Sequence, residues 1–354
     1  MKTINFSILF LLLIFIISGC EKEDNELDSE IIEELPDLYN WHNVSSPGVN
    51  LVILTSMVGY TSINRSAGYH GAEYYLKKSS DGMVHFENIR FKSGDLGCYS
   101  LSEMFFCNRD TGFIAENCAG TLSILRTTDG GASWEYINAG APIGLSMFFL
   151  DPNLGYYSFH LGYYPTNIQE SYLMKFEEDT SRILLSTKKY VFDENGYSIK
   201  TRIHFIDNST GFIATKDSSA NSVILKTING GEDWEETVFF EDFLFNDIAF
   251  VTDSIGFIIG DNGLLLKTED RGNTWTLFNS STGFNLESIS IAKNGTGYIV
   301  GDQGTILKTT DFGESWQSES FIDDSRLIYI KYFPDTLCYI NTSSGQLYRK
   351  LIKL

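Results

Sequence analysis

Short stretches in which apolar and polar residues alternate recur along most of this chain, and Gly, Asp or Asn bounds them. One recurring stretch is a glycine followed by an aromatic and β-branched residues, as in VGYTSI at Gly59, TGFIAT at Gly211 and TGYIVG at Gly297. A second is an alternating segment that ends in a basic residue, as in SILRTT, VILKTI and TILKTT. Each kind occurs seven times when weaker copies are counted. No stretch keeps a helical period, so the pattern predicts β-strands throughout.

The spacing of these stretches predicts the architecture. The last three units carry GLLLKT at Gly263, GTILKT at Gly304 and GQLYRK at Gly345, at intervals of 41 residues. A period of about 40–45 residues with several short strands is typical of a propeller blade. Seven units therefore predict an all-β fold, a seven-bladed β-propeller with four-stranded blades.

The last unit ends without a fourth strand, and we expect that strand at the other end of the chain. Trp41 precedes the Gly59 stretch by 18 residues, and the tryptophans at 134, 234, 275 and 316 precede the next such stretch by 21 to 22. The shared register predicts that the segment around Trp41 pairs with the C-terminal strand and closes the ring. Residues 37–354 are then a single domain.

An octapeptide follows the basic strand in several units: TTDGGASW, TINGGEDW, TEDRGNTW and TTDFGESW. Its aspartate can accept hydrogen bonds from backbone NH groups of a turn, its glycine permits a left-handed conformation, and its tryptophan buries a large ring. Asn229 replaces the aspartate in one copy, which argues against metal binding or acid catalysis. We assign a structural role to Asp129, Trp134, Asn229, Trp234, Asp270, Trp275, Asp311 and Trp316.

These octapeptides resemble the Asp-box, the S/T-x-D-x-G-x-S/T-W pattern found between the third and fourth strands of many propellers. Together with the GxLLKTxDGGxxW rhythm of the units, they make the chain most similar to the seven-bladed photosystem II assembly and stability factor family. That resemblance implies a non-catalytic assembly factor that binds proteins, without implying a photosynthetic role. Related propellers in sialidases and xyloglucanases imply the alternative, a surface glycan-binding protein or glycosidase.

The N-terminus predicts export and a lipid anchor. Lys2, an apolar run over residues 6–17 and the sequence ISGC resemble a lipoprotein signal peptide over residues 1–19, with Cys20 as the lipidated residue. Residues 20–36 are an acidic run that we interpret as a flexible tether. We expect the protein on the bacterial outer membrane, anchored through Cys20, and the run resembles signals for surface exposure.

The net charge and the cysteine pattern limit which kinds of partner and ligand we expect. The formal net charge of −20 disfavours nucleic acid. No CxxC pair or clustered histidines suggest a metal, and no cofactor motif is present. One disulfide among Cys98, Cys107 and Cys118 and a set of unpaired thiols that includes Cys338 both remain open. We interpret His42, His85 and His204 as strand residues.

Two insertions suggest where a partner binds. Residues 63–75 and 159–171 enlarge the turn between the second and third strands of units one and three, and both are rich in tyrosine. Tyrosine suits protein or sugar surfaces. We assign a recognition patch to Tyr69, His70, Tyr74, Tyr163 and Tyr164, with packing of the two insertions over each other as the alternative. No catalytic residue is assigned, and Arg202, the nearest candidate for a sialidase arginine, is interpreted as an ordinary strand residue.

Overall fold

The computed structural model describes residues 40–352 except 46, 48–49, 67–71, 90–97, 119–120, 142–145, 164–167, 192–200, 220, 241–242 and 335. The predicted signal peptide, Cys20 and the acidic tether therefore lie outside the described residues. In the part of the chain that is described, no helix has the length and apolar character needed to cross a membrane.

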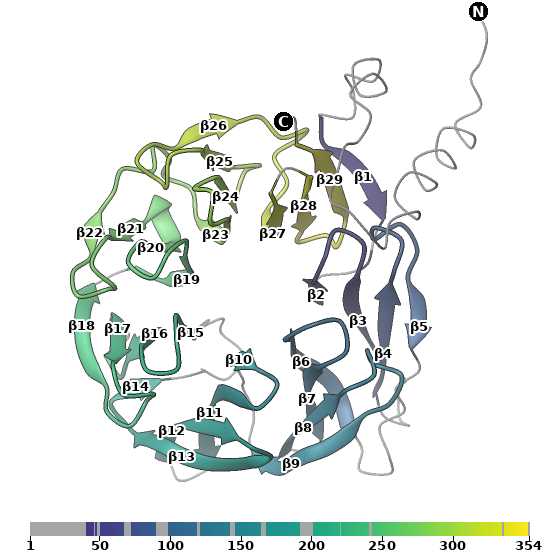
Figure 1. Ribbon diagram of the computed structural model, residues 1–354, viewed down its shortest axis with the longest axis vertical. Coiled ribbons are helices and arrows are strands. Elements are labelled where there is room, and N and C mark those ends of the chain that lie inside the picture. Colours follow the sequence, from purple (N-terminus) through teal and green to yellow (C-terminus); the bar gives the residue numbers. More distant parts are fainter. Residues whose placement is uncertain are drawn as a thin grey trace, which may run out of the picture.

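Seven sheets stand around a central axis as the blades of a propeller, each built as an antiparallel meander whose strands A to D run outward (Figure 1). Blade 1 contains β2 (Asn50–Ile53), β3 (Gly59–Ser66), β4 (Ala72–Ser79) and β5 (Glu87–Ile89). Blade 2 contains β6 (Cys98–Phe106), β7 (Gly112–Cys118), β8 (Thr121–Thr127) and β9 (Glu135–Ala141). Blade 3 contains β10 (Ser146–Asp151), β11 (Leu154–Tyr163), β12 (Ile168–Glu177) and β13 (Thr180–Thr187).

Blade 4 contains β15 (Arg202–Phe205), β16 (Gly211–Asp217), β17 (Ser222–Thr227) and β18 (Glu235–Phe240), with the two-residue β14 (Tyr190–Val191) added beside β16. Blade 5 contains β19 (Phe245–Phe250), β20 (Gly256–Gly260), the 3-10 turn η3 (Asp261–Gly263), β21 (Leu265–Thr268) and β22 (Thr276–Leu277). Blade 6 contains β23 (Leu286–Ile291), β24 (Gly297–Gly301), β25 (Ile306–Thr309) and β26 (Gln317–Glu319). Blade 7 contains β27 (Leu327–Phe333), β28 (Leu337–Thr342), β29 (Leu347–Leu351) and β1 (His42–Ser45).

Blade 7 closes the ring as predicted, because its outermost strand comes from the N-terminal part of the chain. Strand β1 pairs antiparallel with β29, and His42 lies opposite Arg349. Trp41, just before β1, is 6% exposed. The prediction of seven sheets and of this closure is confirmed.

The recurring glycine-aromatic stretch packs each blade against its neighbour. Tyr60 of blade 1 stacks on Phe106 of blade 2 with ring centroids 3.9 Å apart. The other face of Phe106 covers Gly112, where a Cβ would lie 2.3 Å from the ring. The same three-part contact recurs as Phe113, Phe149 and Gly155, and as Tyr156, Phe205 and Gly211. Glycine is required there because the phenylalanine ring occupies the volume of any side chain.

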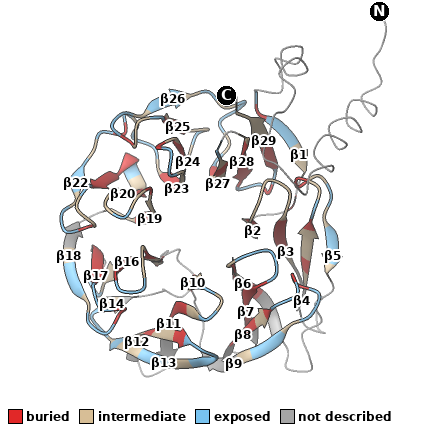
Figure 2. Ribbon diagram, in the orientation of Figure 1, coloured by how far each residue is buried: buried red, intermediate tan, exposed pale blue. Residues whose placement is uncertain are grey.

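Burial follows the strand order. The middle strands, such as β17, β20 and β24, are buried along their whole length. The outer strands are largely exposed, and Figure 2 shows this as pale blue segments on the rim of the disc. The core is therefore a set of layers between blades, with the A strands around the axis.

Candidate binding site

The polar side chains of the octapeptide turns form hydrogen bonds within the turns themselves. Asp129 Oδ1 accepts a hydrogen bond from the Ser133 backbone NH at 2.8 Å, and Thr127 Oγ1 accepts one from the Gly131 NH at 2.8 Å. Hydrogen bonds from Ser133 lower the pKa of Asp129 to about 2. Asp270, Asn229 and Asp311 accept the equivalent backbone NH at 2.9, 3.0 and 3.0 Å. Since asparagine makes the same bond, the carboxylate charge is not needed for this turn.

The tryptophans of these turns also serve packing. Trp134 and Trp234 donate their indole NH to the carbonyl oxygens of Gly131 and Gly231 in the same turns, at 3.2 and 3.0 Å. Trp275 and Trp316 lie edge-on to Phe212 and Phe257 of the preceding blades, with ring centroids 6.1 and 5.8 Å apart.

The turns also contact the preceding blade through strand B. Tyr60 and Tyr156 donate their hydroxyl groups to the carbonyl oxygens of Gly130 and Gly230, at 3.0 and 3.2 Å. Blade 3 has no octapeptide and joins β12 to β13 through Glu178 and Asp179, both at positive φ. His85 lies in the turn before β5 and not in a strand, with its Nδ1 2.7 Å from Asp81 Oδ2.

The predicted recognition patch falls mostly outside what the structure describes. Tyr69, His70 and Tyr164 lie outside the described residues. For Tyr74, in β4, and Tyr163, in β11, the backbone is described and the side chains are not.

The two insertions extend hairpins. In blade 1 the pairing of β3 with β4 continues to Ser66 opposite Ala72, and in blade 3 that of β11 with β12 continues to Tyr163 opposite Ile168. Strands β11 and β12 have 10 residues each, whereas β20 of blade 5 has 5. The face that carries these B-to-C hairpins, here called the hairpin face, is therefore taller over blades 1 to 3 than over blades 5 and 6.

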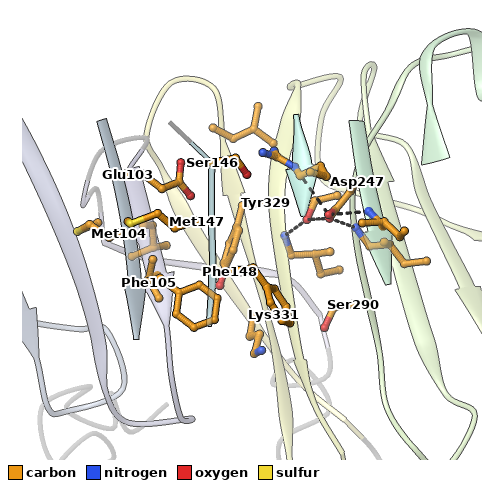
Figure 3. A pocket seen from close by; sticks show the side chains of 18 of the residues that line it. Glu103, Met104, Phe105, Ser146, Met147, Phe148, Asp247, Ser290, Tyr329 and Lys331 are labelled. Atoms are coloured by element: carbon orange, nitrogen blue, oxygen red, sulfur yellow. Dashed lines mark hydrogen bonds and ion pairs between the residues drawn. The ribbon is translucent and has the colours of Figure 1, made fainter. Parts of the chain in front are cut away.

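A cavity of about 560 Å³ lies on the axis, lined by the innermost strands of all seven blades (Figure 3). Residues two apart on a strand point the same way, so the lining forms two layers. The layer nearer the hairpin face, here called the upper layer, consists of Glu103, Ser146, Arg202, Asp247, Ser288 and Tyr329. The lower layer consists of Val52, Phe105, Phe148, His204, Ser290 and Lys331. The upper layer is thus polar and the lower layer is half aromatic.

Most charged side chains of the cavity have partners. Arg202 donates from Nε to the Asn246 carbonyl oxygen at 3.0 Å and lies 3.9 Å from Asp247 Oδ1. Glu287 Oε1 is 2.7 Å from Arg326 Nη2. Burial lowers the pKa of His204 to about 4, so this ring is neutral near pH 7.

Upper-layer side chains in blades 5 to 7 also accept hydrogen bonds from the backbone of the next blade. Asp247 accepts from the Ile289 NH at 3.0 Å, Ser288 from the Ile330 NH at 3.4 Å, and Tyr329 from the Ile53 NH at 3.2 Å. In the lower layer Ser290 accepts from the Tyr332 NH at 3.0 Å. These bonds satisfy backbone groups at the inner edges of the sheets, which would otherwise be buried without partners.

Glu103 departs from this arrangement. Within the described part of the chain no hydrogen bond or ion pair reaches its carboxyl group, and Arg202 is the one cation that affects its titration. Burial raises the pKa of Glu103 from 4.5 to about 7. The carboxyl therefore changes charge near neutral pH.

This shift predicts a pH-dependent stability. A pKa raised by folding means that the protonated acid favours the folded state, so the contribution of Glu103 is full below about pH 4.5 and is lost as pH rises through 7. Glu103→Gln should therefore unfold with the same free energy as the wild type near pH 4, and be more stable by about 1–3 kcal/mol at pH 8. Urea denaturation at both pH values checks this. Equal differences between variant and wild type at the two pH values would contradict it.

These features define the class: a seven-bladed β-propeller with a cavity on its axis whose upper layer is polar, and with one half of its hairpin face raised. Residues 191–280 match the family model of the photosynthesis system II assembly factor YCF48. The predicted resemblance to this family is thereby confirmed over those residues.

Solved structures agree with the fold. A structure of YCF48 bound to a D1 peptide is similar with a TM-score of 0.63 and 15% identity, covering 89% of this chain and 97% of that chain. YCF48 from Cyanidioschyzon merolae gives a TM-score of 0.61 and 16% identity, covering 88% and 99%. The WD40 propeller domain of Doa1 gives 0.59 and 9%, covering 88% and 96%. No curated protein matches the chain.

Proposed function

We propose that this protein is a non-catalytic binding scaffold of the bacterial envelope that engages a protein partner on the raised part of its hairpin face. The observation that carries the proposal is the similarity, across 89% of the chain, to a propeller whose structure holds a bound peptide. The raised hairpins of blades 1 and 3 add surface on one side of the ring, where a partner gains contact area. Anchoring through a lipid on Cys20 at the outer membrane is part of the same proposal, supported by the signal sequence.

The tyrosines of the raised hairpins are expected to carry the contact, since tyrosine offers a rigid apolar ring and a polar tip. Tyr69→Ala and Tyr163→Ala should each reduce the amount of partner recovered after crosslinking in intact membranes by about fivefold or more, equivalent to about 1 kcal/mol of binding free energy. Tyr136→Ala is the matched control, because Tyr136 lies 49% exposed on the outer strand β9.

The outcomes are distinct. Unchanged recovery in both variants removes the hairpin tyrosines as the contact. Recovery of no protein, together with binding on a glycan array or release of reducing ends from a polysaccharide, replaces the scaffold with the carbohydrate-active alternative.

A further inference from the structure

Most described side chains at the upper-layer position of each blade follow one pattern, which Ser146 and Glu103 do not share, and of these two only Glu103 can carry a charge. In blades 5, 6 and 7 the side chain at this position accepts a backbone NH of the following blade, and in blade 4 Arg202 donates to a backbone carbonyl of the following blade. Glu103 occupies this position in blade 2 and makes no such bond within the described residues. Its carboxyl points into the cavity beside Ser146 (Figure 3). A bond between blades that other positions make is thus absent at Glu103, where a carboxyl group lines the cavity.

The other charges of the cavity do not neutralise Glu103. Arg202 is engaged by Asn246 and Asp247, as described above. Lys331 lies in the lower layer on β27, two blades away, and its Nζ is 6.0 Å from the ring centroid of Phe333. An ionised carboxylate removed from water without a cation costs several kcal/mol, and a bound cation removes that cost.

The side chains around Glu103 indicate what kind of cation would fit beside it. Met104 and Phe105 follow it on β6, Met147 and Phe148 lie on the neighbouring β10, and all four line the cavity (Figure 3). Phe105 and Phe148 meet edge to face with ring centroids 5.8 Å apart. Thioether and aromatic groups suit a chain of methylene groups, and aromatic faces also attract cations.

We propose that the central cavity binds a primary alkylammonium group, with the ammonium at Glu103 and the alkyl chain along the methionine and phenylalanine side chains of blades 2 and 3. An ammonium offers three donors in a small volume, which fits the carboxyl of Glu103 and the hydroxyl of Ser146 beside it. Lys331 disfavours a second positive charge near the blade 7 side of the cavity. The volume of about 560 Å³ lies within the range of small-molecule sites.

This ammonium group has two sources, a free alkylamine or the lysine side chain of another protein entering from the hairpin face. The inference is independent of the proposed function, because it concerns the cavity and not the raised hairpins. Two probes separate the sources: butylammonium, and a short peptide with one central lysine compared with the same peptide carrying norleucine. Tighter binding of the lysine peptide than of butylammonium indicates a protein lysine, and the reverse indicates a free amine.

The direct test is NMR titration of the full-length protein labelled with ¹³C at the glutamate side-chain carboxyl, where the Glu103 signal is the one lost in Glu103→Gln. Saturating butylammonium should lower the apparent pKa of this carboxyl by about 1 unit or more, because a cation favours the ionised form. Butyrate, with the opposite charge, should not. An unchanged pKa with both probes overturns the proposal in the wild-type protein, without reliance on any variant.

Calorimetry supplies the second readout. Glu103→Gln should weaken butylammonium binding at least tenfold at pH 8, whereas Glu178→Gln, in the exposed β12–β13 turn, should leave the affinity unchanged. Affinity in the wild type should rise between pH 6 and pH 8 as Glu103 ionises. The charged or titratable groups that face the cavity from the other strands are Arg202, His204, Asp247, Glu287, Tyr329 and Lys331. Equal affinity in Glu103→Gln and the wild type, or a pH profile that the variant shares, overturns the assignment to Glu103.

Discussion

Replacing Trp41 with alanine is expected to lower the free energy of unfolding by about 3–5 kcal/mol, the range for truncating a buried aromatic side chain. The indole packs edge-on against Phe321 with ring centroids 6.0 Å apart, and its NH donates to Glu319 at 3.2 Å. Lys350, on the paired strand β29, places its Nζ 5.6 Å from the centroid of the indole ring. The same Nζ donates a hydrogen bond to Glu319 Oε1 at 2.6 Å. Loss of the ring therefore weakens both the packing and the polar contacts that hold β1 in blade 7. Denaturant unfolding of the purified variant measures the change.

Trp41→Phe is the matched control for this effect. It keeps most of the buried apolar surface and removes the NH, so we expect a smaller loss of about 1–2 kcal/mol. If Trp41→Ala unfolded with the same free energy as the wild type, the pairing of β1 with β29 would not contribute to closing the ring.

Gly155→Ala should destabilise the protein by about 2–3 kcal/mol although it adds a single methyl group. The new Cβ would lie 2.2 Å from Phe149, a distance that no side chain tolerates. Phe149 cannot retreat, because its other face stacks on Phe113 of blade 2 with ring centroids 3.7 Å apart. Overpacking of a rigid core costs energy in this range. Thermal and urea unfolding of the variant check the prediction.

Gly283→Ala provides the comparison, since a Cβ there meets no atom within 4 Å and the residue is not at positive φ. We expect its stability to stay within about 0.5 kcal/mol of the wild type. Equal effects at positions 155 and 283 would show that backbone freedom, and not the phenylalanine ring, explains the conserved spacing between glycine and aromatic residue in the repeats.

The number of blades and the ring closure could be predicted because they depend on local patterns. A glycine-aromatic pair marks strand B, and at Gly112, Gly155, Gly211 and Gly256 a phenylalanine ring lies against the glycine where a side chain would be. The register of Trp41 relative to the other tryptophans similarly needed no knowledge of contacts. The fold can therefore be predicted because the same local pattern is repeated along the chain.

The cavity could not be predicted in the same way. Glu103 and Arg202 lie about a hundred residues apart and line the same cavity only after seven sheets are arranged in a ring. On its own strand each occupies an ordinary alternating position, so the sequence alone indicates no role for Arg202 beyond that of a strand residue. The one signal in the sequence is that this position is polar in most units and charged at Glu103, Arg202 and Asp247. The insertions at residues 63–75 and 159–171 are visible in the sequence. That they lengthen the paired strands is not, because this depends on the register of the hairpins and not on their composition.

The pairing of β1 with β29 also sets the order in which the molecule can be completed. About three hundred residues separate the two strands, so synthesis delivers β1 long before its partner. Until then six sheets can assemble, but the seventh lacks β29, and Trp41 lacks the blade 7 residues against which it packs. The Trp41 ring, which is 6% exposed in the completed molecule, therefore stays in contact with solvent until the final strand arrives.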